Sequence, residues 1–344
     1  MFVCQRLKSM AAAEHLEAVA PVPTFPLVSR LRGWPGEVHD TWEGLTVHRP
    51  RFFYIPGVLK WLHGSFYERG LRGWLDTLCS RQPPDVLDAH FVWPDGVGVS
   101  RLAQSLGLPY AITLRGWLYE SMKYPRILRQ CVDALEGAAA VISVSEHLAE
   151  TAAQLGIDCE KIHVIPNGVD VDRFQPRDKR AIRRELGLPF NDKVIVSVAH
   201  LGLRKGHGET LRAVAQLPED VRLVLVGGDT NGGRDRKQIS ALITELGIAH
   251  RVTLAGRQPY EQIPKYLNAA DLSVLASYRE GCPNVILESL ASGTPVVATE
   301  VGAVPDLIQD GHNGRIVPQQ QVSPLRDAMA ELLENPTGPE TVRQ

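Results

Sequence analysis

Short apolar runs alternate with helix-like stretches along most of the chain, and Gly, Pro or Asn residues separate them. Apolar runs of this length are typical of buried strands, and the helical periodicity between them is typical of crossover helices. Strands joined in this way pair in parallel and carry helices on both faces of the sheet. We expect strands at 16–19, 45–48, 86–90, 110–114, 140–144 and 161–165, and then at 194–198, 221–226, 252–254, 272–275, 295–298 and 315–317.

The alternation restarts once, after the turn-rich segment IPNGV at 165–169 and a charged stretch at 177–185 that we interpret as the domain boundary. A chain of 344 residues is long enough for two domains. We therefore predict an α/β fold of two Rossmann-like, doubly wound parallel-sheet domains, at 1–170 and 171–344. Ligands of such sheets bind beyond the carboxyl ends of the strands, so a cleft between the two domains is expected to hold the site.

Both ends of the chain depart from this pattern. The chain opens on a helix with an apolar face, whereas a doubly wound domain normally begins with a central strand and a Gly-rich turn. No closing helix is expected after Leu333. We therefore expect truncated termini and a first domain that lacks its first strand; the alternative is a compact variant of the fold.

Charge and apolar content exclude several classes of protein. Lys and Arg number 37 against 39 Asp and Glu, so a dominant basic surface for nucleic acid is excluded. No apolar run approaches the roughly 18–20 residues that a membrane span needs. The five cysteines are sparse and form no CxxC pair, which favours free thiols in a reducing cytoplasm.

The segment EGCPNVILE at 280–288 carries the sharpest chemical signal. Asn284 is expected to cap a helix whose free N–H groups and macrodipole form an anion site. Glu280 and Glu288 flank that site and can accept hydrogen bonds from hydroxyl groups. A phosphate on the helix end together with hydroxyls on carboxylates is what a nucleotide sugar requires. The alternative interpretation is a loop charge and a solvated helix charge, which the following SGTPVVAT strand and Gly302 disfavour.

With its continuation ESLASGTPVVATEVGAVPDLI, this segment closely resembles the E-x7-E signature of the retaining glycosyltransferases of family 4, which have the GT-B fold. VSVAHLGLRKG, VRLVLVGG, RVTLAGR and NAADLSVLAS extend the resemblance upstream, as do DAHFVWPDGVGVSRLAQSLGLPYAITLRG and VIPNGVDVDRF in the first domain. It covers residues 45 to 318 and is specific for the fold but not for one sugar. The sub-branch resembles bacterial exopolysaccharide or teichuronic-acid-type glycosyltransferases.

The resemblance implies a donor site in the second domain. Glu280 would bind the donor sugar, Glu288 the ribose, and the backbone N–H groups of Asn284 and Val285 the diphosphate. Lys205 would neutralise charge on the departing diphosphate; the alternative is a surface lysine beside a Gly-rich loop.

The other donor-side positions are less typical of the family. His200 stands where the family often has Arg, which puts a second phosphate cation in doubt, and Arg204 is either its substitute or a solvated charge. Gly227 would let the backbone approach the nucleotide, and Arg257 would lie beside the base or in solvent.

The resemblance also implies residues on the acceptor side. Arg115 stands where many relatives carry His, at the carboxyl end of a strand. It either stabilises a phosphate or an acceptor hydroxyl or pairs with a structural carboxylate. Asp95 and Gly96 follow another strand end and would lie near the acceptor, or else only form a turn. Glu280, Lys205 and Arg115 are the predicted catalytic residues.

Residues 44–75 interleave basic and aromatic side chains, which is typical of a membrane-surface element. The basic residues are Arg49, Arg51, Lys60, Arg69 and Arg72, and the aromatic ones are Trp61, Phe66, Tyr67 and Trp74. Such an element would suit a lipid-linked acceptor. The equal alternative is a helix packed on the sheet with ordinary surface charge.

Metal and cofactor motifs are absent from the sequence, apart from Asp170 and Asp172, which form D-x-D by letters but lie in the linker. We predict no metal and no cofactor, with a nucleotide-diphosphate sugar as substrate. The sequence and its resemblance thus predict a cytoplasmic, peripherally membrane-associated glycosyltransferase acting on a glycan or lipid-linked acceptor in cell-surface polysaccharide synthesis, and the resemblance implies that it is a retaining enzyme. The alternatives are a non-catalytic or truncated GT-B module that binds nucleotide sugar, and a GT-B phosphorylase holding pyridoxal phosphate on a lysine.

Overall fold

The computed structural model describes residues 2–25, 40–42, 44–55, 57–229 and 232–343. The chain divides into two compact units, Met1–Pro166 and Asn167–Gln344. The sequence analysis placed the division at 170/171, in the same linker. Each unit is an α/β structure and is described by itself.

Unit 1 contains the parallel sheet β6-β7-β8-β9, formed by Leu87–His90, Tyr110–Leu114, Ala140–Ser143 and Ile162–Val164. Each of these strands coincides with a predicted one to within a residue or two. The helices of this part are α4 (Val97–Leu106), α5 (Trp117–Ser121), α6 (Pro125–Glu136) and α7 (Glu146–Gln154), with short turns η2 (Val92–Gly96) and η3 (Cys159–Lys161). Ile112, Leu114 and Val141 are fully buried, which explains their continuous apolar runs.

The first part of unit 1 departs from a single sheet. The predicted helix at its start is α1 (Phe2–Ala11). Short strands then form two further ladders, β1-β4-β3 and β2-β5. Their bounds are Ala18–Val19 (β1), Val22–Thr24 (β2), Asp40–Trp42 (β3), Leu45–His48 (β4) and Arg51–Phe53 (β5). The pairs β1–β4 and β2–β5 are parallel, whereas β3 pairs antiparallel with β4. The sequence analysis missed β2, β3 and β5 because each spans only three residues.

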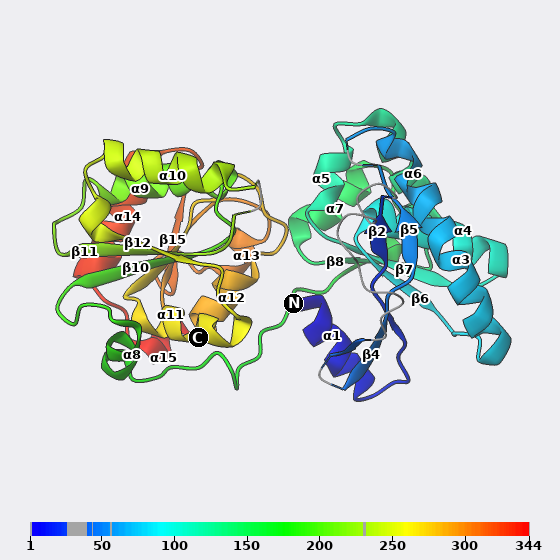
Figure 1. Cartoon of the computed structure of the whole chain (residues 1–344), viewed down its shortest axis with the longest axis horizontal. Helices are drawn as coiled ribbons and strands as arrows, with labels where there is room; N and C mark the ends of the chain where they lie inside the picture. Colours follow the sequence, from blue (N-terminus) through cyan, green and yellow to red (C-terminus); the bar gives the residue numbers. More distant parts are fainter. Residues whose placement is uncertain (1, 26–39, 43, 56, 230–231, 344) are drawn as a thin grey trace. The chain divides into compact units, whose positions relative to one another are not determined.

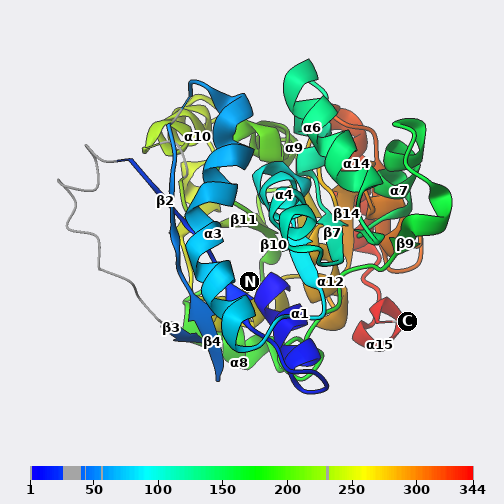
Figure 2. The same ribbon diagram turned by 90° about the vertical axis from the view of Figure 1, so that its right-hand side faces the viewer.

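Helix α3 (His63–Arg81) follows the turn η1 (Lys60–Leu62) and packs along these strands (Figure 2). A Cβ on Gly70 would lie 2.4 Å from Phe52 Cβ, so only glycine lets the helix approach β5 this closely. Tyr67 and Leu71 are buried in the same cluster. The interpretation of a helix packed on strands therefore holds for residues 63–75, the part of the predicted basic aromatic segment that lies in α3.

Unit 2 contains a six-stranded parallel sheet of order β12-β11-β10-β13-β14-β15. The strands are Lys193–Val198 (β10), Val221–Val226 (β11), Val252–Gly256 (β12), Leu272–Leu275 (β13), Val296–Thr299 (β14) and Gly314–Val317 (β15), all of them predicted. The helices are α8 (Lys179–Leu186), α9 (His207–Val214), α10 (Arg234–Glu245), α11 (Ile263–Ala269), α12 (Asn284–Ala291), α13 (Val304–Leu307), α14 (Val322–Glu334) and α15 (Pro339–Val342). Short turns are η4 (Leu203–Lys205), η5 (Ala249–Arg251) and η6 (Tyr260–Gln262).

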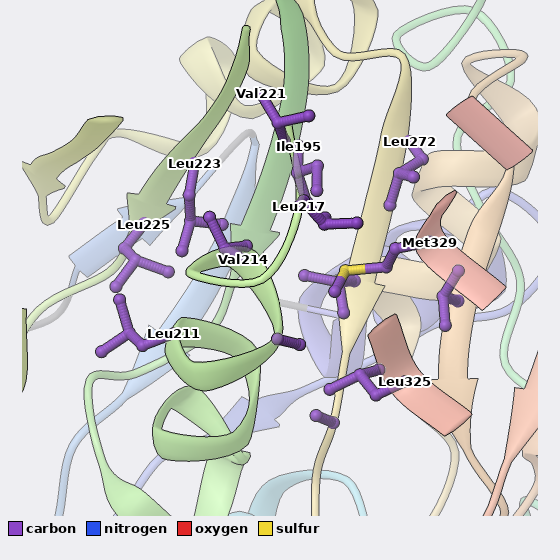
Figure 3. Close-up of a cluster of buried hydrophobic side chains, with 14 of the residues drawn as sticks. Ile195, Leu211, Val214, Leu217, Val221, Leu223, Leu225, Leu272, Leu325 and Met329 are labelled. Carbon is purple, nitrogen blue, oxygen red and sulfur yellow. The ribbon is translucent and has the colours of Figure 1, made fainter. Parts of the chain in front are cut away.

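Helices cover both faces of this sheet (Figure 1). On one face, Leu211 of α9 and Met329 of α14 pack with Ile195 and Leu223 of the strands, as Figure 3 shows. On the other, Leu267 of α11 packs against strand residues. Both faces of the strands are therefore buried, as the parallel sheet requires.

The sequence analysis missed one helix of unit 2, and its expectation of no helix after Leu333 is wrong. The charged stretch 177–185 contains helix α8 and is anchored by Arg183, which is 4% exposed and pairs with Asp271 at 2.6 Å. A short helix, α15, follows Leu333, and its Val342 is fully buried. The charged residues of α8 and the Pro and Gly residues around α15 give no apolar periodicity. Tertiary contacts hold both helices, so the sequence pattern did not predict them.

Candidate active site

The carboxyl ends of β10 and β13 carry two loops that unit 2 brings together. Gly206, with φ 70°, closes the β10–α9 loop, and a Cβ on it would lie 1.9 Å from the carbonyl oxygen of Ala276 after β13. The backbone N–H of Tyr278 donates to the carbonyl of Arg204 at 3.0 Å. These backbone contacts place the Lys205 loop directly beside the loop that carries Glu280.

Lys205 and Glu280 form an ion pair between these loops. Lys205 Nζ lies 2.6 Å from Glu280 Oε1, and the two side chains are 32% and 14% exposed. The sequence analysis assigned the residues separate roles, and their 75-residue separation gives no sign of the contact. The ion pair fixes the position of the Lys205 ammonium group and leaves part of this group accessible to an incoming anion.

A third loop, which follows β14, also contacts the backbone around Glu280. Gly302, with φ 52°, approaches the carbonyl oxygens of Glu280 and Gly281 so closely that a Cβ would lie 2.4 Å from each. The N–H of Ala303 donates to Gly281 at 2.8 Å. The backbone around Glu280 is therefore fixed on two sides, which is the preorganisation that a catalytic group requires.

Helix α12 begins at Asn284 without a capping side chain. Its N-cap residue is Pro283, so the predicted capping role of Asn284 is wrong. The reason is a tertiary contact: Asn167 Nδ2 donates to Asn284 Oδ1 at 2.9 Å and to the Cys282 carbonyl at 3.4 Å. Since no side chain caps the first turn, the N–H groups of Asn284 and Val285 remain suited to bind an anion.

Glu288 lies one turn into α12 and is held by a residue that the sequence analysis missed. The hydroxyl of Tyr260 donates to Glu288 Oε1 at 3.0 Å, and the Tyr260 ring packs against Phe174 and under the guanidinium of Arg173. Burial raises the pKa of Glu288 to about 7, opposed by the Tyr260 hydrogen bond. Tyr260 follows β12 and lies at the same edge of the sheet as Glu280. This position after a predicted strand could have identified Tyr260 as a site residue from the sequence.

We expect the buried carboxyl of Glu288 to make stability depend on pH. Between its ordinary pKa of 4.5 and about 7, the folded protein keeps a proton that the unfolded chain has released. The free energy of unfolding of the wild type, measured relative to Glu288→Gln, should therefore fall as pH rises from about 4.5 to about 7. Thermal unfolding of both proteins across this range tests the sign. Tyr260→Phe removes a hydrogen bond to the charged form and should extend the decline to higher pH; a constant difference would contradict the assignment.

Of the remaining predicted donor-side residues, Gly227 makes a close backbone contact and the others are exposed. A Cβ on Gly227 would lie 1.7 Å from the Ala199 carbonyl, so this glycine lets the β10 and β11 loops pack. His200, Arg204 and Arg257 are exposed at the same edge. The His200 carbonyl accepts a hydrogen bond from His207, which is fully buried. Burial lowers the pKa of His207 to about 4, so it is neutral and fixes the backbone of this loop.

Arg115, Asp95 and Gly96 lie in unit 1: Arg115 directly follows β7, and Asp95 and Gly96 lie in η2, which follows β6. Arg115 is 4% exposed and its Nη2 lies 3.3 Å from Nδ1 of His90, whose pKa burial lowers to about 4. Neutral His90 can therefore accept from the guanidinium. Burial raises the pKa of Asp95 to about 7, and the N–H of Gly96 donates to Phe91 at 3.0 Å.

Asp170, the first residue of the D-x-D letters, makes a local contact in the linker. Asp170 accepts from the backbone N–H of Arg173 at 3.0 Å and closes a local turn. Within the described ranges, no group of three or more metal-ligating side chains converges. In the same part of the chain, every helix is too short or too polar to span a bilayer.

Comparisons with known proteins identify the family of the chain. The family model described as Glycosyltransferase Family 4 matches residues 27–173, and that described as Glycosyl transferases group 1 matches residues 178–344. The chain is 33% identical over 295 residues to TuaC of Bacillus subtilis (strain 168), a protein named as a teichuronic acid biosynthesis glycosyltransferase. The alignment covers 83% of this chain and 71% of TuaC.

Solved structures share the fold. A sucrose-phosphate synthase from Thermosynechococcus elongatus superposes with a TM-score of 0.84 at 24% identity, covering 100% of this chain and 86% of that one. Anabaena HepE, solved in complex with UDP and glucose, superposes with a TM-score of 0.75 at 25% identity, covering 87% and 80%. The GT-B assignment is confirmed, and the chain belongs to the glycosyltransferases that join a family 4 domain to a group 1 domain.

Proposed function

We propose that this glycosyltransferase moves a sugar from a nucleotide-diphosphate sugar to a glycan or lipid-linked acceptor, with retention of the anomeric configuration. The observation that carries the proposal is the Lys205–Glu280 ion pair beside the uncapped start of α12. A cation and a helix N-terminus at one place suit a diphosphate, and the carboxylates suit sugar hydroxyls. The HepE complex with UDP and glucose supports the same donor class.

The donor would bind to unit 2. Its diphosphate would accept hydrogen bonds from the N–H groups of Asn284 and Val285. The ammonium group of Lys205 would stabilise the negative charge that develops on the leaving nucleotide. Glu280 would orient the sugar and Glu288 the ribose. Because Glu288 accepts ribose hydroxyls best as a carboxylate, nucleotide affinity should weaken as pH falls below about 7.

Acceptor, cofactor and location complete the proposal. Arg115 and Asp95 are the acceptor-side groups, since Arg115 directly follows β7 and Asp95 lies in the short turn η2 after β6. The reaction needs no metal, so a chelator should leave it unchanged.

The likeness to TuaC supports a role in cell-surface or exopolysaccharide synthesis. Cys79, Cys131, Cys159 and Cys282 are free thiols, which supports a reducing cytoplasm as the compartment.

A thermal-shift panel of UDP, GDP, ADP and their glucose conjugates tests the donor site. One diphosphate series should stabilise the protein; at 100 times its dissociation constant the gain is about 2.7 kcal/mol. Glu288→Ala should abolish most of this shift, while Glu334→Ala, an exposed carboxylate on α14, should not. A folded protein that none of these nucleotides stabilises would contradict the proposal.

Turnover separates the enzyme from the alternative of a binding module. NMR of the product, or of the sugar released by slow donor hydrolysis, should show the anomer of the donor. Nucleotide binding without any turnover would favour the non-catalytic module, and an inverted anomer would contradict retention.

A further inference from the structure

Two segments of unit 1 that are distant in sequence expose apolar side chains. The segment leading into α3 exposes Val58, Leu59 and Trp61, at 57%, 38% and 39%. The segment between α5 and α6 (Figure 1) exposes Met122 and Tyr124, at 48% and 38%. Single exposed apolar residues are ordinary, whereas a contiguous group indicates an interaction surface.

Side-chain contacts join the two segments into what we name the 58–61/122–126 surface. Lys60 Nζ lies 3.3 Å from the Tyr124 hydroxyl and 4.9 Å from the centroid of its ring. The Arg126 guanidinium lies 5.5 Å from the Trp61 ring. Gln130 of α6 donates to the Trp61 carbonyl at 3.1 Å. The aromatic and basic groups are thus held together before any partner arrives.

The backbone of this surface is strained at Leu59. Leu59 adopts φ 52° and ψ 32°, a left-handed conformation that non-glycine residues rarely take. Here it turns the chain into η1 and leaves Leu59 38% exposed. Burial of the exposed apolar groups by a partner would compensate for this strain, and retained strain of this kind gathers at functional segments.

The charge on the surface identifies the kind of partner. Lys60, Lys123 and Arg126 lie on it, and the acid beside them is Glu120, which pairs with Lys123 at 3.0 Å. The surface therefore carries a positive excess interleaved with Trp, Tyr, Leu and Met. Aromatic side chains prefer the headgroup level of a bilayer, and basic ones bind anionic headgroups.

We propose that the 58–61/122–126 surface binds the face of a bilayer that contains anionic lipid. Its purpose, to hold the enzyme beside a lipid-linked acceptor, rests on the proposed function, whereas the binding itself does not. The surface differs from the basic helix expected at 44–75, because it combines residues 58–61, which precede α3, with the α5–α6 loop. On α3 itself, Tyr67 is buried and Arg72 pairs with Glu68 at 2.9 Å.

Vesicle cosedimentation of the full chain tests the proposal. Vesicles of phosphatidylcholine containing phosphatidylglycerol should bind the protein far better than phosphatidylcholine alone, and added salt should weaken the binding. A basic side chain at such a surface contributes roughly fivefold to binding, so the double variant Lys60→Glu/Arg126→Glu should lose more than about 25-fold. Trp61→Ala should weaken binding without removing the preference for anionic lipid.

The matched control reverses the same amount of charge elsewhere. Arg81→Glu/Arg180→Glu changes exposed residues at the far end of α3 and on α8, and should bind vesicles almost as the wild type does. Equal loss in both double variants, or no binding to anionic vesicles, would overturn the proposal. Self-association that Trp61→Ala abolishes, without vesicle binding, would instead assign the surface to a second copy of the chain.

Nucleotide stabilisation of the same variants keeps the two proposals distinct. The Lys60→Glu/Arg126→Glu protein should respond to the diphosphate as the wild type does, because neither residue belongs to unit 2. Vesicle binding by a protein that no nucleotide stabilises would refute the proposed donor site and leave the lipid surface intact.

Discussion

Replacement of Lys205 by alanine should lower the rate of sugar transfer by about two to three orders of magnitude, the usual effect of removing one preorganised donor to a developing anion. Lys205 is the cation that the structure places 2.6 Å from Glu280, at the edge where α12 begins. Its charge matters most as the nucleotide leaves, so kcat should fall more than donor affinity. Steady-state kinetics with the donor found by thermal shift, together with calorimetric binding of the nucleotide, measure both effects.

Lys265→Ala is the matched control for this experiment. Lys265 is another unit 2 lysine in an ion pair, and it joins α11 to Glu185 of α8. Its replacement should change kcat by less than a factor of about two, because a surface ion pair contributes little. If Lys205→Ala and Lys265→Ala reduce the rate equally, or if Lys205→Ala changes only donor affinity, the proposed role of Lys205 is wrong.

The sequence predicted the parallel strands well because burial on both faces leaves a continuous apolar run. Tyr110–Leu114, Val221–Val226 and Leu272–Leu275 are strands with the predicted bounds. The short strands β2, β3 and β5 leave no such signal. Helix α8 was missed because it buries one apolar residue, Ile182, beside Arg183, whose charge Asp271 and three backbone carbonyls satisfy. Tertiary pairing of a charge is invisible to hydrophobic periodicity.

The site shows the same division between local and tertiary information. Strand order explains why loops after β10 and β13 meet, so the neighbourhood of Lys205 and Glu280 was predictable, although their ion pair was not. Asn284 has the residue type of an N-cap, but Asn167 takes its side-chain oxygen. Local propensity for capping was overridden by a contact across 117 residues of sequence.

Gly206→Ala should destabilise unit 2 and disrupt the donor site together. Gly206 has φ 70°, and an added Cβ would lie 1.9 Å from the Ala276 carbonyl oxygen, which belongs to backbone and cannot rotate away. The loop after β13 would have to move, and that loop carries Glu280. We expect a loss of at least about 3 kcal/mol in the free energy of unfolding, above the range of ordinary substitutions.

Gly187→Ala separates this clash from backbone strain. Gly187 ends α8 with φ 65°, nearly the same conformation, but no atom lies within 4 Å of an added Cβ. Its replacement should cost about 1–2 kcal/mol, the penalty of the left-handed region alone, and should leave nucleotide stabilisation unchanged. Thermal unfolding with and without nucleotide compares the two variants. Because both variants share the backbone strain, only the clash explains a larger loss of unfolding free energy in Gly206→Ala. Equal losses in the two variants, with nucleotide stabilisation intact, would mean that the close approach of Gly206 to Ala276 does not hold the Lys205 and Glu280 loops together.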